Sequence, residues 1–525
     1  MRKTVKKLTA VGLTVTSVLG LVACGSSKGT TSQGTSENKE VTKPDTFTVM
    51  CDGTVVTETN GAEAFYKQLN EATGLDIKWT RPDHASYYDA VANAFNSDDT
   101  MPDVVLLSSD YYALYASNGF LWNMTDAWEH SETKNSGRLI STADNVLSAL
   151  MVNGEDGTKA MYGLSLYRGN GCCTYVKKAW LDKAGIDASK VKDVQMDFNT
   201  YYGYLKQMAQ TMGHYVISSP GFIHPEAPNT NYLPDFYQKA QYTFYKDTSG
   251  KYVDGFAQQE MKEALQRIQT AVNDGVIDKE SVNNSTANAR DKFYSTDPST
   301  ETGVFTYWAG TWANTLKTNL ANKGLDDELI AIKPIKELGA YTERIAPCWC
   351  ITSAAKNPEG IFKYFIDKML DGGDVQMLWT HGAKGTHWDD KAETVTVEKK
   401  EDQPKTYTEG QFHYLPGIEK PDQWQTKNHI DPILSIANFT NGYVGESLIP
   451  EVARENGEFF AENSQVAVPL PMTSELSNNI GDINTARTYV IAQVALGYMT
   501  VDEGMDYYNK TVGSLSNAVL KSLNK

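Results

Sequence analysis

Alternating strand-like and helix-like patterns of apolar residues begin after residue 44. Short apolar runs at 47–51, 75–80 and 104–107 predict strands, and the last run is continuous, which is typical of a strand buried on both faces of a parallel sheet. Apolar residues at helical spacing predict helices over 62–73 and 84–96. Strand, helix, strand, helix, strand predicts an open α/β sheet, whose ligands meet the loops at the carboxyl ends of the strands.

The second half of the chain predicts a second α/β lobe. It has a helical pattern over 258–272 and apolar, strand-like runs at 303–306 and 330–335. Residues 393–406 are rich in Lys, Glu, Thr and Asp, which predicts an exposed hairpin or an insertion. The C-terminus predicts a helix over 483–496 and another from Thr500, which has capping-box spacing to Glu503.

The N-terminus has the pattern of an export signal. Four basic residues precede an apolar run over 8–23 that is shorter than the roughly twenty residues a membrane-spanning helix needs. The segment 21–25, Leu-Val-Ala-Cys-Gly, resembles the lipobox of bacterial lipoproteins, which implies cleavage after residue 23 and lipidation of Cys24. The polar stretch 24–44 predicts a disordered linker. An uncleaved signal anchor is the alternative, and both place the rest outside the cytoplasm.

Charge and cysteine usage narrow the classes of partner. The chain has 48 Lys and Arg against 65 Asp and Glu, and removing the four cations of the signal takes the net charge from −17 to −21. Such an acidic chain argues against nucleic acid or an anionic lipid surface as its partner. The cysteines beyond Cys24 are odd in number and lack histidines at zinc spacing. Buried thiols or a single disulfide are therefore expected, with no metal and no cofactor.

Several segments together resemble one family along nearly the whole mature chain. They are Met-Pro-Asp-Val-Val at 101–105, the stretch 174–186, Trp-Cys-Ile-Thr-Ser at 349–353 followed by Lys-Asn-Pro-Glu, the glycine turn 382–388 and the terminal 500–505. In order and spacing they are similar to the extracellular solute-binding proteins (family 1 type) that serve carbohydrate ABC importers. The stretch 174–186 departs from the family pattern by having Val-Lys-Lys where tyrosine and asparagine are usual.

The resemblance implies a two-lobed, periplasmic-binding-protein-like (type II) α/β fold in which the chain crosses the hinge more than once. We expect lobe 1 to comprise residues 45–170 and about 345–385, and lobe 2 to comprise residues 171–344 and about 386–525. A ligand that contacts both lobes shifts the protein toward its closed form. The closed form is what the membrane permease is expected to recognise.

Aromatic residues in turns are the first candidates for stacking on a sugar ring, because aromatic residues elsewhere usually lie in the core. Trp308 and Trp312 follow a predicted strand in a turn that contains glycine. Trp349 begins the predicted return strand, a position that in the family often provides a stacking platform. His387 and Trp388 follow a glycine turn and are candidates for the lip of the cleft.

Polar candidates lie at the end of a strand and before the predicted crossing. Asp110 and Tyr111 follow the strand at 104–107, where Asp110 either contacts ligand or caps the next helix. Arg168 and Asn170 precede the crossing. Arg168 either forks onto sugar hydroxyls or forms a salt bridge.

The expected function is that of a monomeric substrate-binding lipoprotein on the outer face of the cytoplasmic membrane. It would capture an oligosaccharide and deliver it, unaltered, to an ABC permease. The sequence has no nucleophile elbow, P-loop, zinc-protease or dinucleotide motif, so no catalysis is expected. An oligopeptide-binding lipoprotein, a surface enzyme acting on glycosides and an adhesion module remain as alternatives, since a catalytic carboxylate pair is recognised only in space.

Overall fold

The structure is a computed structural model, and its folded unit is Val41–Lys525. It describes residues 40–53, 61–83, 86–223, 230–325, 327–395, 405–415, 430–431, 433–440, 449–468, 470–471 and 473–525, without the side chains of Asp110, Val395 and Lys405. The predicted signal peptide, Cys24 and the linker up to residue 39 lie outside the described residues.

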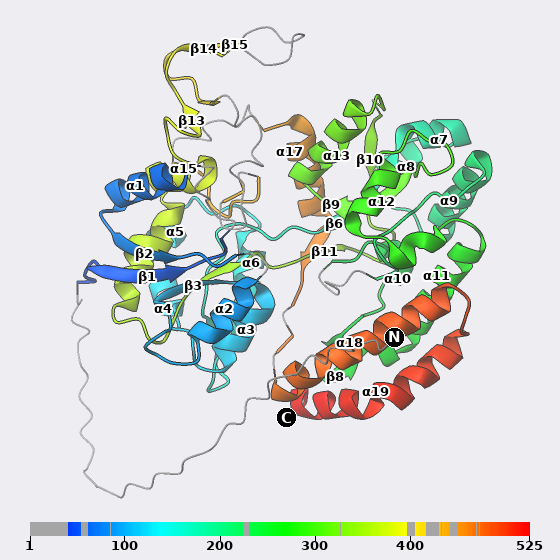
Figure 1. Ribbon diagram of the computed structural model, residues 1–525, viewed down its shortest axis with the longest axis horizontal. Coiled ribbons are helices and arrows are strands. Elements are labelled where there is room, and N and C mark those ends of the chain that lie inside the picture. The colour runs from blue at the N-terminus through cyan, green and yellow to red at the C-terminus, as the bar shows by residue number, and fades with distance from the viewer. Residues whose placement is uncertain are drawn as a thin grey trace, which may run out of the picture. The chain divides into compact units, whose positions relative to one another are not determined.

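Lobe 1 is built on a four-stranded sheet of order β12-β3-β1-β2 (Figure 1). Strand β1 (Thr46–Met50) pairs in parallel with β2 (Asp76–Thr80) and β3 (Val104–Leu107), and β12 (Cys348–Ile351) pairs antiparallel with β3. All four residues of β3 are buried, which explains its unbroken apolar pattern. The three predicted strands of this lobe are thus confirmed.

Helices surround this sheet. Helix α1 (Ala62–Thr73) has its predicted bounds and ends at Gly74, whose φ of 61° suits a residue without a Cβ. Helix α2 (Tyr87–Ala94) is shorter than predicted. The other elements of the lobe are α3 (Ser109–Ser117), α4 (Thr125–Glu129), α5 (Glu132–Asn135), α6 (Ala143–Ala149), β4 (Met151–Asn153), β5 (Lys159–Met161), α14 (Pro358–Ile361), the π-helical turn η5 (Phe362–Ile366), the 3-10 turn η6 (Asp367–Leu370) and α15 (Asp374–His381).

The segment after α15 belongs to lobe 1, which corrects the predicted boundary near residue 385. Ile430, Ile436 and Ala437 lie in the same hydrophobic core as β1 and β3. The side-chain amide of Gln376 on α15 donates to the backbone carbonyl of Ala437 at 2.8 Å, so a side-chain hydrogen bond also joins this segment to α15. We call residues 430–431 and 433–440 the strap. Between α15 and the strap lie β13 (Trp388–Asp389), which pairs with β16 (His413–Tyr414), and the confirmed hairpin β14 (Glu393–Val395) and β15 (Lys405–Tyr407).

Lobe 2 has a three-stranded antiparallel sheet of order β10-β6-β9 and cores separate from that of lobe 1. Its strands are β6 (Cys172–Lys177), β9 (Val304–Trp308) and β10 (Leu329–Ala331), with the hairpin β7 (Phe244–Lys246) and β8 (Tyr252–Asp254). Its helices are α7 (Lys178–Ala184), α8 (Ser189–Lys192), α9 (Phe198–Met212), α10 (Pro234–Tyr237), η3 (Gly255–Ala257), α11 (Gln259–Asn273), η4 (Lys279–Asn283), α12 (Thr286–Phe293), α13 (Thr311–Asn322), α17 (Glu451–Glu462), α18 (Ser474–Ala495) and α19 (Val501–Leu523).

The C-terminal helices α18 and α19 form a long hairpin along lobe 2 (Figure 1). The capping box predicted at the start of α19 is confirmed, with the Thr500 side chain accepting from the Glu503 backbone and the Glu503 carboxylate accepting from the Thr500 backbone. Helix α18 begins nine residues before the predicted start at 483, because Thr473 caps it there. In the described part of the chain, no helix is both long and apolar enough to span a bilayer.

Candidate ligand-binding site

The two lobes are joined by crossings of the chain that lie side by side. The first crossing is 167–171, and the second runs from β11 (Tyr341–Glu343) to residue 346. We call the region where the two crossings meet the joint. Strand β11 pairs in parallel with β17 (Ser464–Val466), so the joint also contains a later segment of the chain (Figure 1). The strap belongs to lobe 1 and α17 (Glu451–Glu462) to lobe 2, so the chain must pass between the lobes once more after residue 440. The resemblance implied more than one crossing, and the described residues imply three.

A buried ion pair ties the first two crossings together. Arg168 donates from Nη2 to Glu343 Oε2 at 2.6 Å and from Nε to Oε1 at 3.4 Å, and both side chains are almost fully enclosed. Ser464 of β17 also donates to the Glu343 carboxylate at 3.3 Å. Of the two roles predicted for Arg168, the structure shows the salt bridge, because the guanidinium is already paired inside the joint.

Close backbone contact also explains the glycines of the first crossing. A Cβ on Gly169 would lie 1.3 Å from the carbonyl oxygen of Arg344, so only glycine fits there. Asn170 is half-buried, and its amide donates to the Ala309 carbonyl at 3.0 Å while its oxygen accepts from the Gly171 backbone at 2.8 Å. Asn170 thereby attaches the crossing to the turn that follows β9.

That turn carries two candidate tryptophans. Gly310, with φ 66°, turns the chain from β9 into α13, and its N–H donates to Asn456 Oδ1 at 2.7 Å. Trp308 ends β9, and the guanidinium carbon of Arg344 lies 4.4 Å from the centre of its ring, a cation–π contact across the joint. Trp312 lies in the first turn of α13 and is 42 % exposed. An exposed indole in the first turn of a helix, shortly after β9 ends, can stack on a flat apolar ligand face.

The sequence analysis missed a carboxylate near the first crossing, Asp431, and we call its desolvated surroundings, with Tyr167 and Tyr414, the recess. Asp431 keeps part of its surface accessible, yet burial raises its pKa to about 6 in spite of hydrogen bonds from the backbone. Tyr167 of the first crossing is likewise half-buried, and burial raises its pKa, with the Arg344 charge opposing this rise and the Asp431 charge adding to it. The Asp431 charge acts on Tyr167, so the two side chains belong to one desolvated region of the protein.

The segment that carries β13 to β16, which we call the insertion, contributes another residue to this recess. Burial raises the pKa of Tyr414 on β16, and the Asp431 charge raises it further. The Tyr414 hydroxyl lies 2.7 Å from His381 Nδ1, which fixes its position at the end of α15. The recess thus combines tyrosine hydroxyls and a carboxylate, groups that can accept and donate hydrogen bonds to a hydroxyl-rich ligand.

The strap touches lobe 2 next to this recess. A Cβ on Gly457 of α17 would lie 2.7 Å from Ile433 Cγ2 and 4.0 Å from the Cα of Gly310. The strap, α17 and the Gly310 turn therefore meet at one point. Asp431, two residues before Ile433, lies close to the turn that carries Trp308 and Trp312.

Trp349 lies elsewhere, in the core of lobe 1. It is 1 % exposed and makes edge contacts with Phe365 and Trp379 at 5.9 and 5.5 Å between ring centres. The hypothesis that Trp349 offers a stacking face does not fit this enclosed position. The physical reason is that β12 pairs with the central strand β3 and packs against η5 and α15. The side chain of Trp349 therefore lies inside the core of lobe 1.

The residues of the glycine turn are also structural. His387 is 1 % exposed, and its Nδ1 accepts from the Ala383 backbone at 2.7 Å. Trp388 stacks on Phe412, with ring centres 5.0 Å apart, and donates from Nε1 to the Gly382 carbonyl at 2.8 Å. These contacts hold the start of the insertion in place. Neither side chain is therefore positioned at the edge of an open cleft, as had been predicted.

At the carboxyl end of β3, Tyr111 stacks on Tyr88 with ring centres 3.9 Å apart. Asp110 does not cap the next helix, because α3 begins at Ser109 with Ser108 as its N-cap; its side chain lies outside the described residues, so its predicted ligand contact remains a prediction. Tyr111 stays a candidate contact from lobe 1.

The cysteines of the folded body are buried thiols. Cys51, Cys172, Cys173, Cys348 and Cys350 are all free, which settles the two predicted alternatives in favour of thiols. Burial raises the pKa of Cys173 and of Cys348 to about 12, so both stay protonated and unreactive at neutral pH. Among the described residues, no group of His, Cys, Asp and Glu is arranged to hold a metal ion.

Comparison with known proteins identifies the architecture. No protein-family model matches the chain, and no curated protein matches it. Among solved structures, the N-glycan transport solute-binding protein NgtS from Streptococcus pneumoniae aligns with 17 % identity and a TM-score of 0.58 over 91 % of this chain and 98 % of its own. This chain has the two-lobed solute-binding fold. A solute-binding protein from Bifidobacterium longum infantis that binds human milk oligosaccharides (14 %, TM-score 0.58, 91 % and 98 %) and the alginate-binding protein AlgQ2 (15 %, 0.57, 93 % and 99 %) share it.

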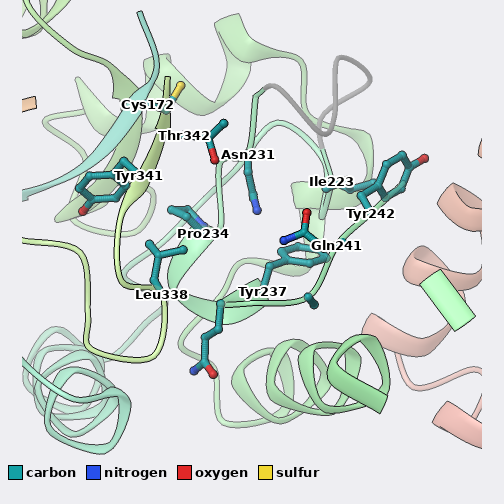
Figure 2. Close-up of a pocket in the computed structure, with 12 residues that line it drawn as sticks. Cys172, Ile223, Asn231, Pro234, Tyr237, Gln241, Tyr242, Leu338, Tyr341 and Thr342 are labelled. Atoms are coloured by element: carbon teal, nitrogen blue, oxygen red, sulfur yellow. The ribbon is translucent and has the colours of Figure 1, made fainter. Parts of the chain in front are cut away.

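A second cavity in this solute-binding fold lies in lobe 2 and at the second crossing (Figure 2). Tyr237, Tyr242 and Tyr341 line it, and Figure 2 shows Asn231 extending between them. Among the described residues, no side chain that lines this cavity is charged and none comes from lobe 1. A ligand there would not contact both lobes, so we place the candidate site at the recess and the Trp312 turn instead.

Proposed function

We propose that this protein is the substrate-binding component of an ABC importer and that it captures an oligosaccharide between its lobes. The observation that carries the proposal is the exposed indole of Trp312 next to the joint, on a fold shared with proteins whose names record N-glycan, alginate and milk-oligosaccharide binding. A sugar ring offers an apolar face to such an indole and hydroxyls to the polar recess behind it.

The joint between the lobes allows a bound ligand to bring them together. A ligand that contacts Trp312 on lobe 2 and Asp431 on lobe 1 binds the closed form more tightly than the open form. The free energy of binding both surfaces is what shifts the lobes together, and the three crossings restrict the motion to a hinge. No step in this cycle breaks a covalent bond, so the proposed protein is not an enzyme.

The proposal includes attachment to the outer face of the cytoplasmic membrane. The lipobox-like segment ending at Cys24 and the polar stretch 24–44 support a lipid anchor followed by a flexible tether. The permease would then meet the closed form at the membrane, with the protein acting as a monomer.

Calorimetric titration with neutral tetrasaccharides and with tetrapeptides tests the function, together with small-angle scattering for closure. We expect heat with at least one oligosaccharide and a smaller radius of gyration in its presence. Heat with peptides alone would show a peptide importer. Release of reducing ends from the bound sugar would show an enzyme.

A pair of tryptophan variants tests the site. Trp312→Ala is expected to weaken binding about tenfold, or ~1.4 kcal/mol, with little change in stability because the side chain is exposed. Trp349→Ala is the matched control, because loss of a fully buried indole costs about 3–5 kcal/mol of unfolding free energy. Unchanged affinity in Trp312→Ala would show that the ligand lies elsewhere.

A further inference from the structure

The cavity of Figure 2 extends from the body of lobe 2 to the second crossing. The segment 231–242 supplies most of its walls, and Tyr341 and Thr342 of β11 supply the wall that belongs to the crossing. Its volume is about 640 Å³, part of which is open solvent. Pockets that hold small molecules span roughly 300–1,000 Å³. The cavity therefore has room for a small molecule, such as a single sugar ring.

Two polar groups in these walls have no hydrogen-bond partner in the part of the chain that the structure describes. Asn231 is half-buried, and its Oδ1 accepts from the backbone N–H of Leu233 at 2.9 Å, whereas its Nδ2 makes no hydrogen bond. The hydroxyl of Thr342 makes none either. Figure 2 shows both groups turned toward the middle of the cavity. A partly desolvated amide gains from a ligand oxygen that accepts its N–H.

The tyrosines of the cavity offer ring surfaces rather than free hydroxyls. Tyr237 donates to the Phe222 carbonyl at 3.0 Å, and Tyr341 donates to the Ile332 carbonyl at 2.9 Å. None of the described side chains that line the cavity is charged, so a charged ligand would lose water without gaining a counter-charge. The molecule that fits has an apolar face, no net charge and oxygens that accept hydrogen bonds.

The same wall contains a strained backbone position. Gln238 has φ 55° and ψ −118°, and among the described residues it is the only one other than glycine with a positive φ. Its N–H donates to the Pro234 carbonyl at 2.7 Å, which ends α10 at the cavity. Strain of this kind persists only where the surrounding structure holds it, and it is concentrated at ligand sites. A specific turn, rather than loose packing, therefore shapes this wall.

The cavity also touches the hinge. Thr342 precedes Glu343, whose carboxylate is paired with Arg168. A Cβ on Gly171 would lie 2.1 Å from the Thr342 carbonyl oxygen, so the backbone of β11 lies directly against the first crossing. A molecule in the cavity therefore contacts a strand that is attached to both crossings.

We propose that this cavity is a second binding site for a small uncharged molecule of the size of one sugar ring, and that its occupancy changes the affinity between the lobes for the oligosaccharide. The second site stands apart from the proposed function, whereas the coupling rests on it. Such coupling is reciprocal, so the oligosaccharide should change the affinity for the small molecule by the same factor.

Ligand-observed NMR with single sugars tests the site. The neutral probes are glucose, mannose and N-acetylglucosamine, and the charged probes are glucuronate and glucosamine. We expect at least one neutral probe to bind, and both charged probes to bind at least about tenfold more weakly than it does. Equal binding of a charged probe, or no binding of any neutral probe, overturns the proposal.

Asn231→Asp tests the unpaired amide. Aspartate keeps an oxygen for the Leu233 N–H and replaces the donating Nδ2 by an acceptor, so binding of the neutral probe should fall by about 10- to 100-fold. Asn123→Asp is the matched control, because Asn123 Oδ1 also accepts from the backbone two residues on, at 3.0 Å from the Thr125 nitrogen, but lies exposed on lobe 1. Unchanged affinity in Asn231→Asp, or an equal loss in Asn123→Asp, contradicts the assignment.

Thr342→Val tests the hydroxyl on the hinge strand. Valine keeps the branched shape at an exposed strand position and removes only the hydroxyl, so the melting temperature should stay unchanged while the neutral probe binds more weakly. A role in folding alone would lower the melting temperature and leave binding of the probe to the folded protein intact. That result would overturn the part assigned to Thr342.

Titration of an oligosaccharide with and without the neutral probe measures the coupling. We expect its affinity to change by about fivefold or more in the wild-type protein and to stay constant in Asn231→Asp. A probe that only competes at Trp312 would act equally in both proteins, which would overturn the coupling. If no oligosaccharide binds, the proposed function fails and the coupling fails with it, whereas probe binding through Asn231 still supports the second site.

Discussion

Two buried arginine–carboxylate pairs hold two different regions of this molecule. Arg168 and Glu343 join two chain crossings between the lobes, whereas Arg487 and Asp254 join α18 to β8 inside lobe 2 at 2.8 Å. The Asp254 carboxylate also accepts from Tyr508 at 2.7 Å and Ser516 at 2.6 Å, so α19 is attached to the same group.

The difference lies in what surrounds each pair. Arg487 is fully buried, and four aromatic rings lie within 6 Å of its guanidinium carbon. Arg168 instead lies between backbone segments that approach so closely that Gly169 admits no Cβ. The same chemistry therefore anchors a rigid helical hairpin in one region and aligns the strands of a hinge in the other.

Breaking the pair inside lobe 2 should have the largest effect on stability. Asp254→Ala leaves the Arg487 charge buried without its partner, at a cost of about 3–5 kcal/mol in unfolding free energy. Denaturant unfolding measures it, and ligand affinity of the folded protein should stay unchanged. A loss below about 1 kcal/mol would mean that the aromatic rings alone hold Arg487.

Breaking the hinge pair should cost less stability but should also change binding. Arg168→Met leaves Glu343 with the Ser464 hydroxyl as its remaining donor, at a cost of about 2–4 kcal/mol. Because the pair aligns two crossings, we expect a changed ligand affinity and a changed radius of gyration without ligand. If the ligand affinity of Arg168→Met is unaltered, the Arg168–Glu343 pair has only a stabilising role, like the Arg487–Asp254 pair, and the proposed difference between the two is wrong.

The contact between the lobes at Gly457 predicts a smaller effect. Gly457→Ala places a methyl group 2.7 Å from Ile433 Cγ2, so the strap and α17 must separate slightly when the lobes close. Ligand affinity should fall by about threefold to tenfold in calorimetry. Gly481→Ala in α18 is the control, since nothing lies within 4 Å of the added methyl group. The ligand affinity of Gly481→Ala should not change. Equal losses of affinity in both variants would contradict a role for the contact between Gly457 and Ile433.

The last predicted effect is a pH dependence of stability near the hinge. Burial raises the pKa of Asp431 from 3.8 to about 6, so the folded state favours the protonated carboxyl. The resulting stabilisation is present below pH 3.8 and is lost as pH rises through 6. The difference in unfolding free energy between Asp431→Asn and the wild type should therefore grow in favour of the variant from pH 4 to pH 7. A constant difference would contradict the desolvation of Asp431.

Much of the fold could be predicted because its elements have local causes. Gly74 ends α1, Thr500 and Glu503 start α19, and the unbroken apolar run of β3 requires a strand covered on both faces. The boundary near 385 could not be predicted in this way. It depends on the strap returning to the core of lobe 1 through Ile430 and Ile436, a contact that no local pattern signals.

The candidate site was predicted less well, for a related reason. Trp312 and Trp349 are both tryptophans next to strand ends, yet one is 42 % exposed and the other 1 % exposed. Asp431 was missed because it precedes Pro432, and an Asp-Pro step ordinarily indicates only a turn. Burial of its carboxylate arises from tertiary packing, and the tyrosines on which its charge acts, Tyr167 and Tyr414, are distant or separated from it in sequence.

By itself the sequence determined the alternation of strands and helices, the caps and turns that bound them, and the export-signal pattern at the N-terminus. These depend on residues within a few positions of one another. Only the tertiary structure decided which aromatic rings stay exposed, which arginine is already paired and which carboxylate is desolvated. Exposure and pairing are properties of the neighbours that folding brings together, and in this protein those neighbours are far apart in the sequence, as Arg168 and Glu343 are.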